Sequence, residues 1–500
     1  MDVGQVAKVS TGALGGGFGR GTRAFAHAFG VVFAIAFASF GWQARGLIGE
    51  HGIAPAREFL QMAHRAVGED AYWKVPSLFW MGSSDGIIMA VCWIGVALSV
   101  VMALGIAPAP LSLICWALYL SLCSVSSPFL DFQWDILLLE TALLAAVALP
   151  WRLRPDWSVE GPVRKVGRLL LWWLLFRLMF ESGVVKLTWG DKSWLEFRAL
   201  TYHFETQCIP HWVAWYLFQL PPFVHQLLCG FTLVAELIAP FCIVLPRRWR
   251  HAGAMVMIGL QVGIIATGNF AFFNWLSIAL CLPLFDDRFW ARKTGTPSEP
   301  APLNPPASPE WKYVVAGAFA IFNLVATIPS LIMSFRIAVA DPVGSELASL
   351  RSFNGYGLFR VMTKERPEII VEGSNDGTNW QAYEFRWKPG DVNRRPGIVA
   401  PHQPRLDWQM WFAALGDIRE NPWFVRFLVR LLEGSPEVLS LLEKNPFPDG
   451  APNYVRAELY DYHFTRWAEH SAAWWKREPT REYCPPISLK DVAGAGENSP

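Results

Sequence analysis

Nine apolar stretches, each close to the length of a membrane-spanning helix, precede residue 336 and restrict the fold more than any other feature of the chain. The hydrocarbon core of a bilayer needs roughly 20 mostly apolar residues in a helix. The sequence therefore predicts an α-helical polytopic membrane bundle of about nine spans. Phe270–Phe285 is short and contains Asn274, so it could instead form a buried re-entrant element. The stretches are Ala24–Trp42, Gly86–Ala107, Leu111–Ser127, Phe132–Leu149, Leu169–Val185, Val224–Leu245, Ala252–Thr267, Phe270–Phe285 and Tyr313–Phe335.

Charged residues concentrate after these stretches. Residues 336–500 hold 42 of the 85 Lys, Arg, Asp and Glu residues, whereas the first 335 residues hold 43. This contrast predicts a transmembrane domain over 1–335, a water-soluble domain over 336–490 and a flexible tail over 491–500. The Pro-rich run 294–309 is expected to be a cytosolic linker before the last span.

Lysine and arginine are distributed unequally between the two sets of loops. With nine spans and the N-terminus inside, the inside loops hold 15 of them and the longer outside loops hold 7. The positive-inside rule then places the C-terminal domain outside the cytosol. The net charge of +1 leaves no basic surplus for a phosphate backbone, so nucleic acid is not an expected partner.

The soluble domain is predicted to be β-rich with one or two helices. Two β-prone runs within 368–387 flank Asn375-Asp376-Gly377, which is typical of a hairpin turn. Residues 454–465 alternate aromatic and polar side chains, as strands do. The apolar spacing of 407–414 and 423–432 favours helices that cover one face of a sheet.

Charged residues inside apolar spans are costly and are functional candidates by default. Gln133 and Glu140 share one face of the fourth stretch, and Asp131 and Asp135 share another. The two aspartates are expected to cap the N-terminus of the helix, where negative charge is favoured. Glu140 lies deeper and is the stronger functional candidate.

The fifth stretch carries Arg177 and Glu181 four residues apart, followed by Lys186. Arg177 and Glu181 could pair within the helix, as a packing element or as part of a catalytic site. Lys186 at the outer end is expected to extend to the lipid headgroups. The alternative is a lysine held in a cavity with a lowered pKa, which could act as a base.

The loop after Lys186 is dense in polar groups. His203, Glu205 and Cys208 do not match a common zinc spacing, and no cofactor motif occurs, so neither a metal nor a cofactor is predicted. Of the eight cysteines, Cys208 and Cys484 are predicted to lie outside the spans, on the oxidising side. They could form a disulfide or remain two thiols.

Several motifs resemble the lipase maturation factor family, in the same order and over about 130–490. They are FQWDILLLET at 132–141, ESGVVKLT at 181–188, YHFETQCIP at 202–210, AWY at 214–216, TGNFAFFN at 267–274, Asp286-Asp287, FNGYGLF at 353–359, GSNDGTNW at 373–380, PRLDWQMWFAA at 404–414, NPFP at 445–448 and 454–460.

The resemblance implies a multi-pass protein that helps dimeric lipases reach their active fold, resident in the endoplasmic reticulum in animals. It also implies that the tail contacts the client, a lipase or another exported protein. The chain lacks a usable Asn-x-Ser/Thr sequon and ends without a retention signal. These features, with the Ala- and Trp-rich composition, favour a bacterial inner membrane over the endoplasmic reticulum.

A shorter stretch is similar to vitamin K-dependent γ-carboxylase and related HTTM-type membrane proteins. SGVVKL at 182–187, with Lys192-Ser193-Trp194-Leu195 downstream, resembles their Gly-x-x-Lys-Leu motif, which implies that Lys186 corresponds to a base.

Two functions therefore stay open. The first is a non-enzymatic folding factor whose tail binds a client while the bundle anchors it in the lipid bilayer. The second is a membrane enzyme, acting on a lipid or a membrane-near peptide, in which Lys186, Glu140 and His203 converge as catalytic residues. The other residues predicted to contribute to a client site or a structural polar cluster are Gln133, Asp135, Arg177, Glu181, Tyr202, Glu205, Cys208, Asn269, Asn274, Trp380, Trp408 and Trp411.

Overall fold

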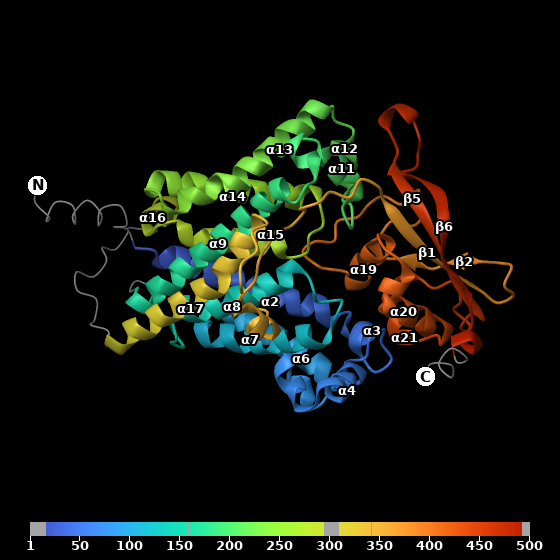
Figure 1. Cartoon of the computed structure of the whole chain (residues 1–500), viewed down its shortest axis with the longest axis horizontal. Coiled ribbons are helices and arrows are strands. Elements are labelled where there is room, and N and C mark those ends of the chain that lie inside the picture. The colour runs from blue at the N-terminus through green and yellow to red at the C-terminus, as the bar shows by residue number, and fades with distance from the viewer. Residues whose placement is uncertain (1–16, 158–159, 295–309, 342, 493–500) are drawn as a thin grey trace, which may run out of the picture.

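The computed structural model describes residues 17–157, 160–294, 310–341 and 343–492. Long helices run side by side through most of the molecule, and the sheet of the C-terminal domain stands at one end of them (Figure 1). Residues 295–309 and 493–500, where most of the predicted linker and flexible tail fall, lie outside the described residues.

Among the described residues, six helices are long and apolar enough to cross a membrane. These six correspond to six of the nine predicted spans, and the other three predicted stretches do not meet the same criteria of length and apolar composition. The six are α2 (Gly19–Gly41), α6 (Asp85–Ala103), α7 (Pro108–Val125), α13 (Pro222–Leu237) with the 3-10 turn Ala239–Val244, α14 (Arg247–Thr267) and α17 (Glu310–Ser334).

The other three apolar stretches form helices that differ from these six in length or charge. α8 (Gln133–Ala148) has 16 residues, and α15 (Phe273–Cys281) has nine. α9 (Pro162–Thr188) has 27 residues but carries several charged side chains. α8 packs between α7 and α9, and most of its residues are buried, so it lies in the interior of the bundle.

Shorter helices complete the chain. Before the C-terminal domain they are α3 (Ala44–Ile48), α4 (Ala56–Val67), α5 (Ala71–Lys74), α10 (Lys192–Leu195), α11 (Ala199–Thr206), α12 (Trp212–Phe218), α16 (Asp287–Thr294) and α18 (Gly344–Leu347). Within the domain they are α19 (Arg405–Ala414), α20 (Pro422–Leu432) and α21 (Pro436–Leu439).

The two ends of α2 identify the two ends of the bundle. Near its start, Asp287 N donates to Gly17 O at 2.8 Å, and Asp287 Oδ1 accepts from Arg20 N at 2.8 Å. Just beyond its other end, Gln43 Nε2 donates to Gln403 O in the C-terminal domain at 2.8 Å. The start of the described chain and the C-terminal domain therefore lie at opposite ends of the bundle (Figure 1).

The C-terminal domain contains a four-stranded antiparallel sheet in the order β2-β1-β5-β6. Its strands are β1 (Pro367–Ser374), β2 (Gln381–Ala382), β5 (Tyr454–Phe464) and β6 (Trp475–Ile487), and β3 (Glu384–Phe385) pairs with β4 (Leu442–Lys444). The predicted hairpin is confirmed, because β1 pairs with β2 across a turn in which Asp376 Oδ1 accepts from Thr378 N at 2.9 Å.

The predicted strand over 454–465 and the helices over 407–414 and 423–432 are also confirmed, and α19 packs on β1 while α20 packs on β5. The sequence did not reveal β6. This strand is mostly exposed and contains three prolines, which an edge strand can accommodate.

Candidate functional site

An extended segment between the last long helix and the sheet runs over the buried polar groups of the bundle. We call residues 352–362 the connector. It contains no regular helix or strand, yet several of its backbone groups bind buried side chains of the membrane helices.

Glu140 of α8 and Arg177 of α9 form an ion pair in which both side chains are fully buried. Arg177 Nη1 donates to Asn354 O at 2.6 Å, and Tyr356 Oη donates to Glu140 Oε2 at 2.8 Å. The connector therefore adds hydrogen bonds to this pair, although Arg177 Nε has no partner among the described residues. These bonds matter because an unsatisfied charge is costly in a region without water.

Glu181 binds the connector rather than Arg177. Its Oε2 accepts from Tyr356 N at 2.6 Å, and its Oε1 accepts from Ser330 Oγ of α17 at 3.3 Å. The Arg177–Glu181 pair that the four-residue spacing suggested is not formed, because Arg177 pairs with Glu140 instead. One residue further along the connector, Gly357 N donates to Gln133 Oε1 at 3.2 Å.

Lys186 is buried, with 2% of its side chain exposed. Its Nζ lies 2.8 Å from Glu236 Oε2 and donates to Ser182 O at 3.1 Å and to Leu358 O of the connector at 3.0 Å. The expectation that this lysine extends to the headgroups is wrong, because the connector and α13 cover its end of α9. The sequence reasoning missed Glu236, although a carboxylate within the apolar stretch Val224–Leu245 was a signal for it.

Of the three residues proposed as catalytic, Glu140 lies apart, whereas Lys186 and His203 both line a cavity of about 230 Å³. Glu140 is bound by Arg177, and Lys186 lies nine residues after Arg177, about 13 Å along α9. His203 of α11 packs its ring against Phe359 at 5.1 Å. Burial and the positive charge of Lys186 lower the pKa of His203 to about 4, so this imidazole is neutral at neutral pH.

Asp135 joins the bundle to the C-terminal domain. It forms a fully buried pair with Arg405 at the start of α19, with Nη1–Oδ2 and Nη2–Oδ1 distances of 2.6 and 2.9 Å, and accepts from Tyr119 Oη at 2.6 Å. The expected capping role is wrong for Asp135, since its oxygens are used by these two partners. Asp131 instead pairs with Arg351 at 2.6 Å in a more exposed position.

Asn269 holds a second part of the C-terminal domain. Its Oδ1 accepts from Val399 N at 2.8 Å and from Ala400 N at 3.1 Å, and its Nδ2 donates to Gly397 O at 2.9 Å. Asparagine thus supplies both a donor and an acceptor to one loop.

The end of α11 and the residues after it bind the sheet and the residue just before its first strand. Arg366, which is fully buried, donates to the carbonyl oxygens of Glu205, Gln207 and Cys208 at 2.8, 2.5 and 3.0 Å, and pairs with Glu368 at 2.7 Å. Glu205 Oε1 accepts from the backbone N of β5 at Phe464, at 2.6 Å. The groups considered as metal ligands therefore serve as contacts between the domains. Within the described ranges, no three His, Cys, Asp or Glu side chains converge on a metal site.

Cys208 and Cys484 are both free thiols in the structure, so the disulfide considered from the sequence is not formed. Cys484 pairs with Ala457 on β5, whereas Arg366, which binds the Cys208 carbonyl, bonds to Tyr462 N on the same strand. Ala457 and Tyr462 are five residues apart, or about 16 Å along β5, so the two cysteines are associated with different parts of this strand.

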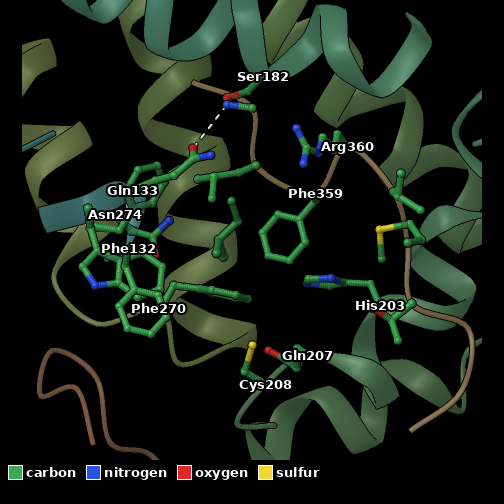
Figure 2. A pocket seen from close by; sticks show the side chains of 18 of the residues that line it. Phe132, Gln133, Ser182, His203, Gln207, Cys208, Phe270, Asn274, Phe359 and Arg360 are labelled. Carbon is green, nitrogen blue, oxygen red and sulfur yellow. Dashed lines mark hydrogen bonds between the residues drawn. The ribbon is translucent and has the colours of Figure 1, made fainter. Parts of the chain in front are cut away.

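A cavity of about 370 Å³ lies between the bundle and the C-terminal domain. Figure 2 shows His203 and Phe359 pointing toward each other inside it, with Gln207 and Cys208 at one edge. Six of the predicted site residues line this cavity, namely Gln133, His203, Cys208, Asn274, Trp408 and Trp411. Two others lie apart from it. Tyr202 contacts Lys364, and Trp380 stacks under the guanidinium of Arg456 at 4.4 Å.

Comparison with known proteins identifies both parts of the chain. The lipase maturation factor transmembrane domain matches residues 21–292, and the lipase maturation factor C-terminal domain matches residues 352–485. Human lipase maturation factor 2 is 33% identical over 93% of this chain and 82% of its own length. Human lipase maturation factor 1 is 32% identical over 94% of this chain and 87% of its own length. No solved structure matches the chain.

Proposed function

Because the chain belongs to the lipase maturation factor family, we propose that it is a multi-pass membrane factor that assists the folding of an exported lipase or a similar client. The bundle positions the C-terminal domain, and the C-terminal domain contacts the client. In this proposal the chain is a folding factor without catalytic residues.

One observation carries this proposal. The buried polar side chains of the bundle bind the backbone of the connector and the arginine that begins α19. A role in holding two domains together accounts for Glu140, Arg177, Glu181 and Asp135. These contacts make the C-terminal domain a fixed platform at one end of the bundle.

For the topology, we propose that α8, α9 and α15 accompany the six candidate spans across the bilayer, which gives nine crossings. An odd number agrees with the placement of the N-terminal end of α2 and the C-terminal domain at opposite ends of the bundle. The arginines of α16 and of the start of α14 lie at the N-terminal end, which favours that end as cytosolic. The C-terminal domain then faces the periplasm of a bacterium or, in a eukaryote, the lumen of the endoplasmic reticulum.

The alternative of a membrane enzyme with Lys186 as its base receives less support. A general base must release its proton and reach a substrate, whereas Lys186 Nζ is bound by a carboxylate and two carbonyl oxygens. The maturation proposal therefore accounts for more of the site.

The test is to purify the full-length chain from its native membrane after crosslinking, and to identify the crosslinked proteins by mass spectrometry. We expect an exported lipase among them. The activity of that lipase per unit mass should fall when the chain is removed and recover when it is restored. A client that keeps full specific activity without the chain would contradict the proposal.

A further inference from the structure

The cavity between the two domains contains buried polar atoms that no group in the described part of the chain satisfies. They are the indole nitrogens of Trp408 and Trp411 and Oε1 of Gln207. These side chains belong to residues that are 3, 8 and 3% exposed. Buried polar atoms in folded proteins normally have a partner, so two donors and one acceptor lining the same cavity indicate a ligand with polar atoms at one end.

Most of the surface that lines the cavity is apolar, although polar side chains, among them Gln133, Asn274 and Arg360, also contribute to the lining. The apolar part includes Phe132, Trp134, Phe270, Phe273, Phe359 and Phe412. A buried water needs two to four polar partners, which walls of this kind do not offer over most of their area. The walls therefore fit an apolar chain, while the unpartnered atoms fit its polar end.

A second cavity of about 230 Å³ continues the first toward the membrane helices. The two share His203, Glu236, Ile264 and Phe359 in their linings, and the His203 and Phe359 rings lie between them. Aromatic contacts alone hold the two rings among the described residues, so rotation of these side chains would join the cavities into one elongated space. Figure 2 shows both rings inside the larger cavity.

The smaller cavity is lined largely by α13 and α14, together with the Lys186–Glu236 pair and residues of α10, α11 and α12, and it lies close to the outer surface of the bundle. Phe231 of α13 is 41% exposed, and a Cβ built on Gly263 of α14 would meet no atom within 4 Å. Both helices are candidate spans, so this surface faces lipid in the proposed topology. An apolar chain could enter from the bilayer between them.

We propose that the two cavities together bind one acyl chain that enters between α13 and α14. The carboxyl or ester oxygens of the ligand accept hydrogen bonds from Trp408 and Trp411, and a hydroxyl group donates to Gln207 Oε1. Arg360 also lines the larger cavity, and its cation can pair with a carboxylate or a phosphate. This proposal goes beyond the maturation function and does not depend on the identity of the client.

The direct test uses the full-length chain in nanodiscs and a fatty acid that carries a photoactivatable diazirine. After illumination, peptide mass spectrometry identifies the labelled residues. We expect strong labelling of peptides that contain 203–208, 357–363 and 405–412, above the background on the lipid-exposed helix α6. Labelling restricted to α6 and other outward faces would overturn the proposal.

Two matched variants of α14 test the path by which the acyl chain enters the cavities. Ile264→Trp should fill the boundary of the two cavities and reduce labelling of the three peptides at least tenfold. Val262→Trp adds the same side chain at an exposed position of the same helix that does not line either cavity, and should leave labelling unchanged. Equal labelling in both variants would contradict the proposal that the acyl chain occupies the boundary of the two cavities.

The polar end is tested with Trp408→Phe and Trp411→Phe, which keep the aromatic surface and remove the N–H groups. Each should weaken binding of the probe about three- to tenfold. The melting temperature of the unliganded variants should fall only modestly, because each variant loses part of a buried ring but no hydrogen bond. If instead both variants bind the probe as the parent does, the indoles do not hold its polar end and the proposal fails.

The source of the ligand is distinguished by extracting lipids from the purified chain and identifying them by mass spectrometry. A retained phospholipid would identify a bilayer lipid, and a retained fatty acid or monoacylglycerol would identify a free acyl compound. Both outcomes support an acyl site. Extracts of the parent no richer in lipid than those of Ile264→Trp would contradict it.

Discussion

At the scale of single residues, the pair of Asp135 and Arg405 links the bundle to α19. Neither side chain is exposed, and two hydrogen bonds join them. We expect Asp135→Asn to lower the free energy of unfolding by about 3–5 kcal/mol, because the change leaves a buried cation without its partner. Thermal unfolding of the purified protein in detergent would measure the loss.

Asp131→Asn is the matched control for this prediction. Asp131 lies four residues before Asp135 and pairs with Arg351. This pair is partly exposed, with side-chain exposures of 36% for Asp131 and 24% for Arg351. Solvent screens such a pair, so its removal should change the free energy of unfolding by about 1 kcal/mol or less. Similar losses in the two variants would mean that the Asp135 pair does not hold the domains together.

Lys186 and Glu236 allow the two functional hypotheses to be separated at residue scale. Glu236→Gln alone should destabilise the protein by about 3 kcal/mol, because it leaves Lys186 buried without a carboxylate. The double change Lys186→Met with Glu236→Leu removes both charges and should restore most of that stability.

The specific activity of the client lipase is the second measurement on the double variant. If Lys186 only holds the connector, client activity should stay close to that obtained with the parent chain. Complete loss in a variant that is stable and correctly inserted would favour the enzyme hypothesis, since methionine cannot accept a proton.

At the scale of elements, the connector should be rigid although it lacks regular secondary structure. The backbone N–H of Met362 donates to Asp191 Oδ2 at 2.7 Å. We expect Asp191→Asn to increase hydrogen exchange at Met362 roughly tenfold or more, as the loss of a charged acceptor would. Asp376→Asn, which should release Thr378 in the hairpin turn, is the control and should leave Met362 unchanged.

The same anchor predicts a pH dependence. Burial raises the pKa of Asp191, but hydrogen bonds from Met362 and Ser193 outweigh this and lower the pKa below its usual value of 3.8. A lowered pKa means that the stabilisation is present above pH of about 4 and is lost as the pH falls further. Protection at Met362 should therefore persist from neutral pH down to about pH 4. Loss of protection near pH 6 would show that another group controls the connector.

Some of these elements could be predicted from neighbouring residues. The others could not, because they depend on pairing between residues that are distant in the sequence. The hairpin around Asn375-Asp376-Gly377 and the helix α19 follow from neighbouring residues, and the structure contains both. β6 escaped prediction because it is charged and rich in proline, so only its pairing with β5 makes it a strand.

The same limit applies to the candidate site. Glu140, Arg177 and Lys186 stood out because charges within apolar stretches are rare. The pairings did not follow from the sequence, because Glu140 and Arg177 are 37 positions apart, Lys186 and Glu236 are 50 apart, and Asp135 and Arg405 are 270 apart. Periodicity assigns a residue to a face of a helix but not to its contact in the folded chain.

At the scale of the whole molecule, the proposed topology predicts opposite compartments for two reporter fusions. A reporter that is active only outside the cytosol should be active after Pro500 and inactive after Lys293, at the other end of the bundle. An enzyme that is active only in the cytosol should give the reverse pattern. Activity of both fusions in the same compartment would rule out nine crossings with the N-terminus inside.

The position of the connector in the chain has a consequence for biogenesis. The connector groups that bind Glu140, Arg177 and Glu181 leave the ribosome only after every membrane helix has been made. A nascent chain that stops before residue 352 would carry these charges without their partners, and a cell's quality-control proteases act on exposed defects of this kind. The connector, which is synthesised after every membrane helix, therefore reports that the bundle is whole, and only a chain translated beyond it would escape degradation.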